Sequence, residues 1–203
     1  MTAAKYLAIL VGGRGTRMGH VSKGNLAVSA SPGAESVLAR MIRVGRDAGL
    51  APWLVGDAEA YPWALAQDNV RHCLDAPDCE GPLAGLLAVL RASESPFVLV
   101  GCDMPFVTAE VLRRLAREHQ DAPALAARGE AGWEPLCARY DPAKILTETE
   151  SAVREGVRSF KRLLPRVGCV EWALSEHERL TLRDWDTPED LTRDRPEHGD
   201  PAT

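Results

Sequence analysis

The chain has 203 residues, of which 45% are apolar and 26% charged, so it can form one α/β domain with a proper core but hardly two. A net charge of −5 argues against a nucleic-acid partner, because binding a phosphate backbone needs a basic face. The five cysteines contain no Cys-x-x-Cys pair, and neither a leader sequence nor an apolar stretch of roughly 18 residues is evident, so we expect a cytoplasmic protein with reduced thiols and no membrane contact.

Apolar periodicity predicts strands and helices that alternate through the first two-thirds of the chain. A continuous apolar run at residues 7–11 is typical of a strand buried on both faces of a parallel sheet. Further strands are expected at residues 52–55, 69–74 and 97–100. The helices between them carry the apolar residues within 37–42, 60–67, 83–90 and 111–115.

The last third of the chain is less regular. In chain order we expect strands at 124–127 and 135–139, a helix over 142–153, a short helix with 160–164 that Pro165 ends, strands at 169–172 and 180–182, and a helix that starts at Thr187-Pro188. The chain contains no internal repeat and no linker. We therefore expect a single domain over residues 1–192 and a charged, disordered tail over 193–203.

Alternating strands and helices favour an α/β fold, a three-layer α/β/α sandwich around a mostly parallel, Rossmann-like sheet. In such sheets ligands bind beyond the carboxyl ends of the strands. The loops after Val11, Leu74 and Val100 all leave such ends, so we expect these three loops to form one site.

Glycines and cations crowd the loop after Val11. The backbone N–H groups of a glycine-rich loop can surround an anion, and cations among them neutralise its charge. The spacing is neither that of a Walker A loop nor that of a dinucleotide fingerprint, whose third glycine would come one residue earlier. Although most loop cations are simply solvated, the pattern favours a triphosphate cradle formed by Gly12, Gly13, Arg14, Gly15, Arg17, Gly19 and Lys23.

The run Leu-x-Gly-Gly-x-x-x-Arg-Met-Gly followed by a lysine resembles the signature of nucleotidyltransferases with a glycine-rich loop. The doubled glycine and the spacing to the lysine are more similar to the molybdenum cofactor guanylyltransferases (molybdopterin-guanine dinucleotide synthases) than to sugar-nucleotide enzymes. The resemblance covers about residues 5–192 and implies a fold of the nucleotide-diphospho-sugar transferase type. It adds Leu10 and Met18 to the nucleotide-binding residues, and it implies catalytic roles for Lys23, over the α- and β-phosphates, and for Arg17.

A single acid, Asp103, follows the strand at 97–100 in the sequence Gly-Cys-Asp-Met-Pro. A carboxylate at this place can bind Mg²⁺, which takes one or two protein carboxylates together with phosphate oxygens and water. Taken alone, Asp103 could equally cap a turn before the next helix. The resemblance assigns Asp103 to magnesium, as a nucleotide-binding and catalytic residue.

The segment Gly-Pro-Leu-Ala-Gly at residues 81–85 matches a family segment that lies beside the base and the ribose. A plain helix start would explain its middle residues equally well. Two acids precede the segment, and a carboxylate can accept hydrogen bonds from both N1–H and the amino group of guanine. We favour Asp75 over Asp78 because Asp75 is nearer the strand end. The nucleotide-binding residues expected here are Asp75, Gly81, Pro82, Leu83 and Gly85.

Two further places are candidates for binding the acceptor substrate. Glu134 opens a Glu-Pro-Leu segment that resembles the family's acceptor side, where molybdopterin would bind; an ordinary exposed acid at a strand entrance is the equal alternative. Arg158 belongs to a basic group with Arg154 and Lys161 that either receives the acceptor's phosphate or faces solvent.

Asp184 and Asp186 are also acceptor-side candidates, and they stand where the family's Asn-x-Asn-Thr-Pro segment has asparagines. Two carboxylates that faced a triphosphate would repel it unless a cation lay between them. They therefore either bind Mg²⁺ or face away from it. Ser22, where the family has an acid, and Asn25, where it has an apolar residue, are further departures.

The resemblance implies an enzyme that uses Mg²⁺ to transfer GMP from GTP to the terminal phosphate of molybdopterin, with or without molybdenum, and releases pyrophosphate. Positioning and charge neutralisation carry most of such a reaction, so no side chain need act as nucleophile. Proteins of molybdenum cofactor delivery would be partners. The alternatives are a cytidylyltransferase or sugar-phosphate nucleotidyltransferase on the same fold, and a nucleotide-binding protein without catalysis.

Overall fold

We describe the fold from a computed structural model, in which the described residues are 2–11, 22–29, 31, 33–129 and 132–194. The expected cradle residues from Gly12 to Gly19 lie outside the described residues, as do residues 195–203 of the expected tail.

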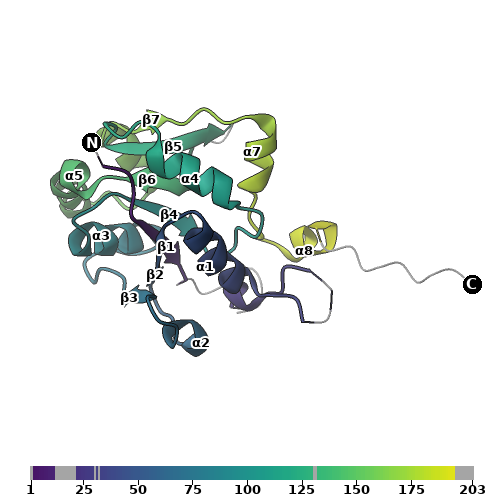
Figure 1. The fold of residues 1–203 in the computed structure, drawn as a ribbon. Coiled ribbons are helices and arrows are strands. Elements are labelled where there is room, and N and C mark those ends of the chain that lie inside the picture. Colours follow the sequence, from purple (N-terminus) through teal and green to yellow (C-terminus); the bar gives the residue numbers. More distant parts are fainter. Residues whose placement is uncertain (1, 12–21, 30, 32, 130–131, 195–203) are drawn as a thin grey trace, which may run out of the picture.

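One seven-stranded sheet forms the centre of the described chain, in the order β3-β2-β1-β4-β6-β5-β7 (Figure 1). Among the strands of the described residues, only β6 is antiparallel to its neighbours, whereas β1 pairs in parallel with β2 and β4, β2 with β3, and β5 with β7. The expected mostly parallel sheet is confirmed. The strands are β1 (Tyr6–Leu10), β2 (Ala51–Val55), β3 (Arg71–Cys73), β4 (Phe97–Gly101), β5 (Ala124–Gly129), β6 (Gly132–Tyr140) and β7 (Val170–Glu171).

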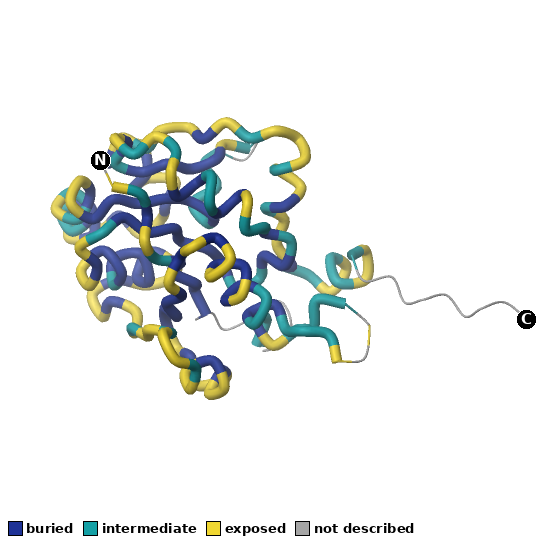
Figure 2. Tube along the Cα trace, viewed as in Figure 1, coloured by how far each residue is buried: buried dark blue, intermediate teal, exposed yellow. Residues whose placement is uncertain are grey.

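Helices cover both faces of this sheet and bury two separate cores. Helices α1 and α4 pack against each other and share one core with the side chains of Leu7 and Ile9, while α3, α5 and α6 cover the opposite face (Figures 1 and 2). The three-layer sandwich is thereby confirmed. The helices are α1 (Val37–Asp47), α2 (Pro62–Leu65), α3 (Pro82–Ala92), α4 (Ala109–Arg117), α5 (Pro142–Arg154), α6 (Phe160–Arg166), α7 (Glu176–Thr181) and α8 (Pro188–Asp194), with a 3-10 turn at Lys23–Asn25. None of the helices in the described part of the chain is long and apolar enough to cross a membrane.

The predicted strand at residues 180–182 is wrong. Residue 180 lies in α7, where the side chain of Ser175 accepts a hydrogen bond from the backbone N–H of Glu178, and the Glu178 carboxylate accepts one from the N–H of Ser175. This capping box satisfies N–H groups that a short helix would otherwise expose. Leu180 remains 57% exposed, so its apolar character does not mark a buried strand. At the chain end, α8 includes Arg193, which was expected in the tail.

Gly45, a residue type of low helix propensity, has a packing role inside α1. A Cβ atom at Gly45 would lie 2.6 Å from Cδ2 of Leu7, a fully buried residue of β1. Glycine therefore allows α1 to lie close against the central strand, at the cost of lower helix propensity.

We predict that Gly45→Ala lowers stability although alanine favours the helix. Overpacking a core costs about 1–3 kcal/mol, against about 1 kcal/mol gained in helix propensity, so a net loss of about 1 kcal/mol is expected in urea unfolding. In a Leu7→Ala background the same change should cost less, because the clashing methyl group is gone. Equal cost in both backgrounds would contradict the close packing of α1 on β1.

Candidate active site

The carboxyl ends of β1, β2 and β4 meet at one edge of the sheet. The backbone N–H of Val11 donates to the carbonyl oxygen of Val55 on β2 at 2.9 Å, and that of Cys102 donates to Leu10 at 3.1 Å. Leu10, a predicted nucleotide-binding residue, is buried at this edge and pairs with Gly101 of β4. The loops after β1 and β4 therefore begin side by side, as predicted.

Lys23 is the centre of a cluster at this edge. Its ammonium nitrogen lies 2.9 Å from Oδ2 of Asp103 and 2.6 Å from Oδ1 of Asp186, residues that are 80 and 163 positions away in the chain. The side chains of Lys23 and Asp103 are largely buried, at 16% and 19% exposure, whereas Asp186 reaches solvent. The structure therefore joins three predicted site residues and turns Asp186 toward the site.

Among the described residues, the negative charges of this cluster outnumber the positive ones. Burial alone lowers the pKa of Lys23, but hydrogen bonds to Asp186 and Asp103 outweigh it, so the pKa lies above its ordinary value and the ammonium stays charged at neutral pH. Although solvent reaches Asp184, partial desolvation and the negative charges of Asp186 and Asp103 raise its pKa. Within the part of the chain that the structure describes, two carboxylates thus contact one ammonium and a third, Asp184, lies within electrostatic reach, and this excess of negative charge favours a further cation.

Asp103 is held in place by its own loop and by the C-terminal segment. A Cβ atom at Gly101 would lie 2.5 Å from Oδ1 of Asp103, so only glycine lets this carboxylate fold back over the end of β4. The backbone N–H of Trp185 donates to the carbonyl oxygen of Asp103 at 2.9 Å. The segment that carries Asp184 and Asp186 is therefore fixed directly to the Asp103 loop.

Trp185 anchors this segment in the core. The ring is fully buried, packs edge-on against Phe106 at a centroid distance of 6.0 Å, and donates its Nε1–H to Asp194 at 3.1 Å. Just beyond it, Oδ2 of Asp190 accepts the backbone N–H groups of Asp186 and Thr187 at 3.1 and 2.9 Å. A rigid anchor followed by a capped helix start leaves Asp186 little freedom to move away from Lys23.

The carboxylate oxygens of Asp103 and Asp186 are of the ligand type that Mg²⁺ prefers. In the described part of the chain, no group of three or more His, Cys, Asp or Glu side chains is arranged to hold a metal ion by itself. Magnesium takes few protein carboxylates and completes its shell with phosphate oxygens and water. The pair could therefore hold Mg²⁺ together with a phosphorylated ligand.

Asp75 and the start of α3 form the second part of the site. A Cβ atom at Gly85 would collide with Leu10 and would lie 3.3 Å from Oδ1 of Asp75, so glycine brings α3, β1 and this acid together. The loop is closed by a hydrogen bond of 3.2 Å from the N–H of Ala76 to the carbonyl oxygen of Ala84. Gly81, with φ +68°, and Pro82 begin the helix, as expected.

The two acids of this loop differ in their partners. Both Asp78 oxygens accept hydrogen bonds of 2.8 Å from Arg91, which holds the pKa of Asp78 below its usual range. Asp75 has no hydrogen-bond donor among the described residues, and partial desolvation raises its pKa. Asp75 is exposed, and no donor among the described residues occupies its carboxylate, so it is available to a ligand, which favours Asp75 over Asp78 as the base-binding acid.

The structure places only some of the acceptor-side candidates near the Lys23 cluster. Strand β6 is antiparallel to β4, so its residues before Ala138 lie toward the carboxyl end of β4, and Leu136 approaches Gly101 there. Glu134 therefore lies on the part of β6 that is nearest the site. Arg158 donates to the carbonyl oxygens of Val153 and Val157 at 2.7 and 2.9 Å and so completes the end of α5. No hydrogen bond or ion pair of the described residues joins Arg158 to the Lys23 cluster.

Sequence reasoning missed two aromatic residues of this site, Trp185 and Tyr61. Trp185 stands between Asp184 and Asp186 in the sequence, and this position alone indicated that it belongs to the site. Tyr61 is 2% exposed and accepts a hydrogen bond of 3.2 Å from the backbone N–H of Gly24, next to Lys23. No local motif marks Tyr61, because its partner lies 37 residues away.

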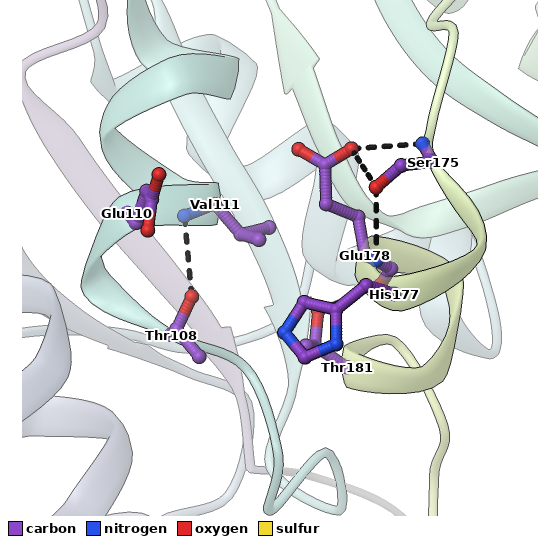
Figure 3. Close-up of a pocket in the computed structure, with 7 residues that line it drawn as sticks. All are labelled: Thr108, Glu110, Val111, Ser175, His177, Glu178 and Thr181. Atoms are coloured by element: carbon purple, nitrogen blue, oxygen red, sulfur yellow. Dashed lines mark hydrogen bonds between the residues drawn. The ribbon is translucent and has the colours of Figure 1, made fainter.

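A separate pocket of about 360 Å³ lies between the start of α4 and α7 (Figure 3). Figure 3 shows the Thr108 cap of α4 on one side and the capping box of α7 on the other. None of the predicted site residues that the structure describes lines this pocket. Its lining residues are Thr108, Glu110, Val111, Ser175, His177, Glu178 and Thr181.

Comparison with known proteins identifies relatives that match most of the chain. A molybdenum cofactor guanylyltransferase of Pseudomonas fluorescens is 33% identical over 168 residues, which are 80% of each chain. A protein named probable molybdenum cofactor guanylyltransferase, from Opitutus terrae, is 31% identical over 199 residues, which cover 94% of this chain and 95% of the relative.

The fold is similar to that of solved structures as well. The crystal structure of molybdopterin-guanine dinucleotide biosynthesis protein A from Archaeoglobus fulgidus superposes with a TM-score of 0.76 and 25% identity, over 94% of this chain and 96% of that one. The sequence model of the MobA-like NTP transferase domain matches residues 7–167, from β1 to the end of α6. This chain therefore belongs to the family of MobA-like NTP transferases.

Proposed function

We propose that this protein is a magnesium-dependent molybdenum cofactor guanylyltransferase, which transfers GMP from GTP to the terminal phosphate of molybdopterin and releases pyrophosphate. One observation carries the proposal: Lys23 lies between Asp103 and Asp186 at the sheet edge to which the glycine-rich loop leads. The names of the relatives, molybdenum cofactor guanylyltransferases, support the same reaction. We further propose residues 1–192 as a single domain and magnesium as the metal.

The glycine-rich loop and Lys23 would hold the triphosphate. Lys23 is the described cation nearest to where that loop ends, and its pKa keeps it charged at neutral pH. An ammonium beside the α- and β-phosphates neutralises the charge that develops as pyrophosphate leaves. We propose that Arg17 and Arg14 of the same loop also bind the triphosphate and neutralise its charge.

Asp75 would select guanine. The N1–H and the amino group of guanine are adjacent donors, and a carboxylate can accept from both at once. Cytosine and adenine present a ring-nitrogen acceptor beside their amino group, which a carboxylate repels. The absence of a donor for Asp75 among the described residues supports this assignment, and it argues for GTP over CTP.

Asp103 and Asp186 would hold Mg²⁺, which, when bound, neutralises negative charge on the phosphates. The protein's own residues then have positioning roles: Lys23 binds phosphate oxygens, and Asp75 fixes the base. The acceptor's phosphate oxygen forms the new bond to the α-phosphorus while the bond to the pyrophosphate oxygen breaks. Glu134 and Asp184 would line the acceptor side, and proteins of cofactor delivery would take the product.

We predict that Asp75→Asn lowers kcat/KM for GTP by about tenfold to a hundredfold, because one of two charge-assisted acceptors is lost. The measurement is pyrophosphate release with molybdopterin as acceptor. Asp78→Asn is the matched control, since that acid is already paired with Arg91, and it should change kcat/KM less than about threefold. Equal losses in both variants would contradict base recognition by Asp75.

Asp103→Ala should reduce turnover about a thousandfold, because the variant lacks a metal ligand and a partner of Lys23. The fold should persist, with cooperative thermal unfolding, because the carboxylate lies at the edge of the core. The magnesium dependence of the melting temperature with GTP present should disappear as well. Normal turnover in this variant would refute the metal assignment.

A further inference from the structure

Tyr61 holds the turn from which the Lys23 side chain projects. The residue precedes α2, is almost fully buried, and its hydroxyl oxygen accepts the backbone N–H of Gly24 at 3.2 Å. This bond ties the segment after β2 to the turn Lys23–Asn25, which is the first described element after the glycine-rich loop.

Gly24 permits a closer approach than any other residue would. A Cβ atom there would lie 2.9 Å from Cε1 and 3.0 Å from the hydroxyl oxygen of Tyr61, so a side chain would force the turn away from the ring. The next residue, Asn25, donates from its side-chain amide to the carbonyl oxygen of Ala60 at 3.1 Å. Two consecutive residues of the turn are thus fixed to two consecutive residues of the loop, which also gives Asn25 a role.

Tyr61 also lies near the Asp103 loop. It belongs to the core cluster against which Cys102, the residue before Asp103, is packed, and burial together with the nearby Cys102 raises the pKa of its hydroxyl. Tyr61 therefore binds the residue after Lys23 and shares a core with the residue before Asp103. A lysine side chain has many rotamers, so the place of its backbone decides how often the ammonium meets its target.

We propose that Tyr61 is a positioning residue that acts through Gly24 to hold the Lys23 ammonium where the phosphates of the nucleotide bind. This proposal rests on one part of the function proposed above, namely that Lys23 binds the phosphates of a nucleoside triphosphate. Tyr61 itself touches neither the nucleotide nor the acceptor; its hydroxyl orients the turn.

The first test examines the contact without reference to function. In Tyr61→Phe, which keeps the ring and removes the hydroxyl, hydrogen exchange of the Gly24 amide measured by NMR should become at least fivefold faster relative to amides of α5. Tyr140→Phe is the matched control, because it also removes one buried hydroxyl, whose hydrogen bond goes to Pro135 on the other face of the sheet. The Gly24 amide should exchange at the wild-type rate in this control.

The second test asks whether the effect passes through Lys23. The dissociation constant of GTP with magnesium, measured by calorimetry, should rise about threefold to tenfold in Tyr61→Phe and stay unchanged in Tyr140→Phe. In a Lys23→Ala background, Tyr61→Phe should add no further loss, because the group that it positions is gone. A merely structural role would add the same loss in both backgrounds.

The proposed role of Tyr61 is overturned if the hydrogen-exchange rate of the Gly24 amide is unchanged in Tyr61→Phe. It is also overturned if Tyr61→Phe lowers GTP affinity equally with and without the Lys23 side chain. Failure of the wild-type protein to bind GTP overturns the proposed function instead. In that case the amide-exchange result by itself decides whether Tyr61 holds the turn.

Discussion

The contact of one ammonium with two carboxylates unites the candidate site. Lys23, Asp103 and Asp186 come from the start, middle and end of the chain, and only the finished sheet brings them to one edge. Because the parallel strands β1 and β4 are neighbours, the loops that follow them must emerge together. The third partner depends on packing: Asp186 reaches Lys23 because Trp185 is buried beside the Asp103 loop.

Small residues decide how closely these parts approach. Gly85 lets α3 meet Leu10 and Asp75, Gly101 lets the Asp103 carboxylate fold back over its strand, and Gly24 lets the lysine turn lie on Tyr61. At each position a methyl group would meet neighbouring atoms at less than a normal contact distance. Glycine thus serves the site through packing as well as through the anion-binding loop.

Much of the fold could be predicted from sequence because its signals are local. The apolar run of β1, the Leu83–Leu90 stripe of α3 and the Thr187-Pro188 start of α8 each act within a few residues, and the structure contains all three elements. The strand predicted at 180–182 failed because Leu180 is apolar yet exposed on a capped helix. Apolar character alone does not separate a buried strand from one turn of a surface helix.

The site could be predicted in part, for a similar reason. Lys23 and Asp103 stand in recognisable motifs at strand ends, so their meeting follows from topology. The choice of Asp75 over Asp78 gains its support from Arg91, which pairs with Asp78 from the far end of α3. Tyr61 and Trp185 act through backbone groups of distant residues, and such contacts leave no spacing pattern in the chain.

The central claim, that this site joins GMP to molybdopterin, is tested most directly by identifying the product. The purified protein would be incubated with magnesium, molybdopterin and an equimolar mixture of GTP, CTP, ATP and UTP, and the dinucleotides separated and weighed by mass spectrometry. The account predicts the guanine dinucleotide as the dominant product, with one pyrophosphate released for each. A dominant cytosine dinucleotide, or consumption of no nucleotide at all, would contradict it.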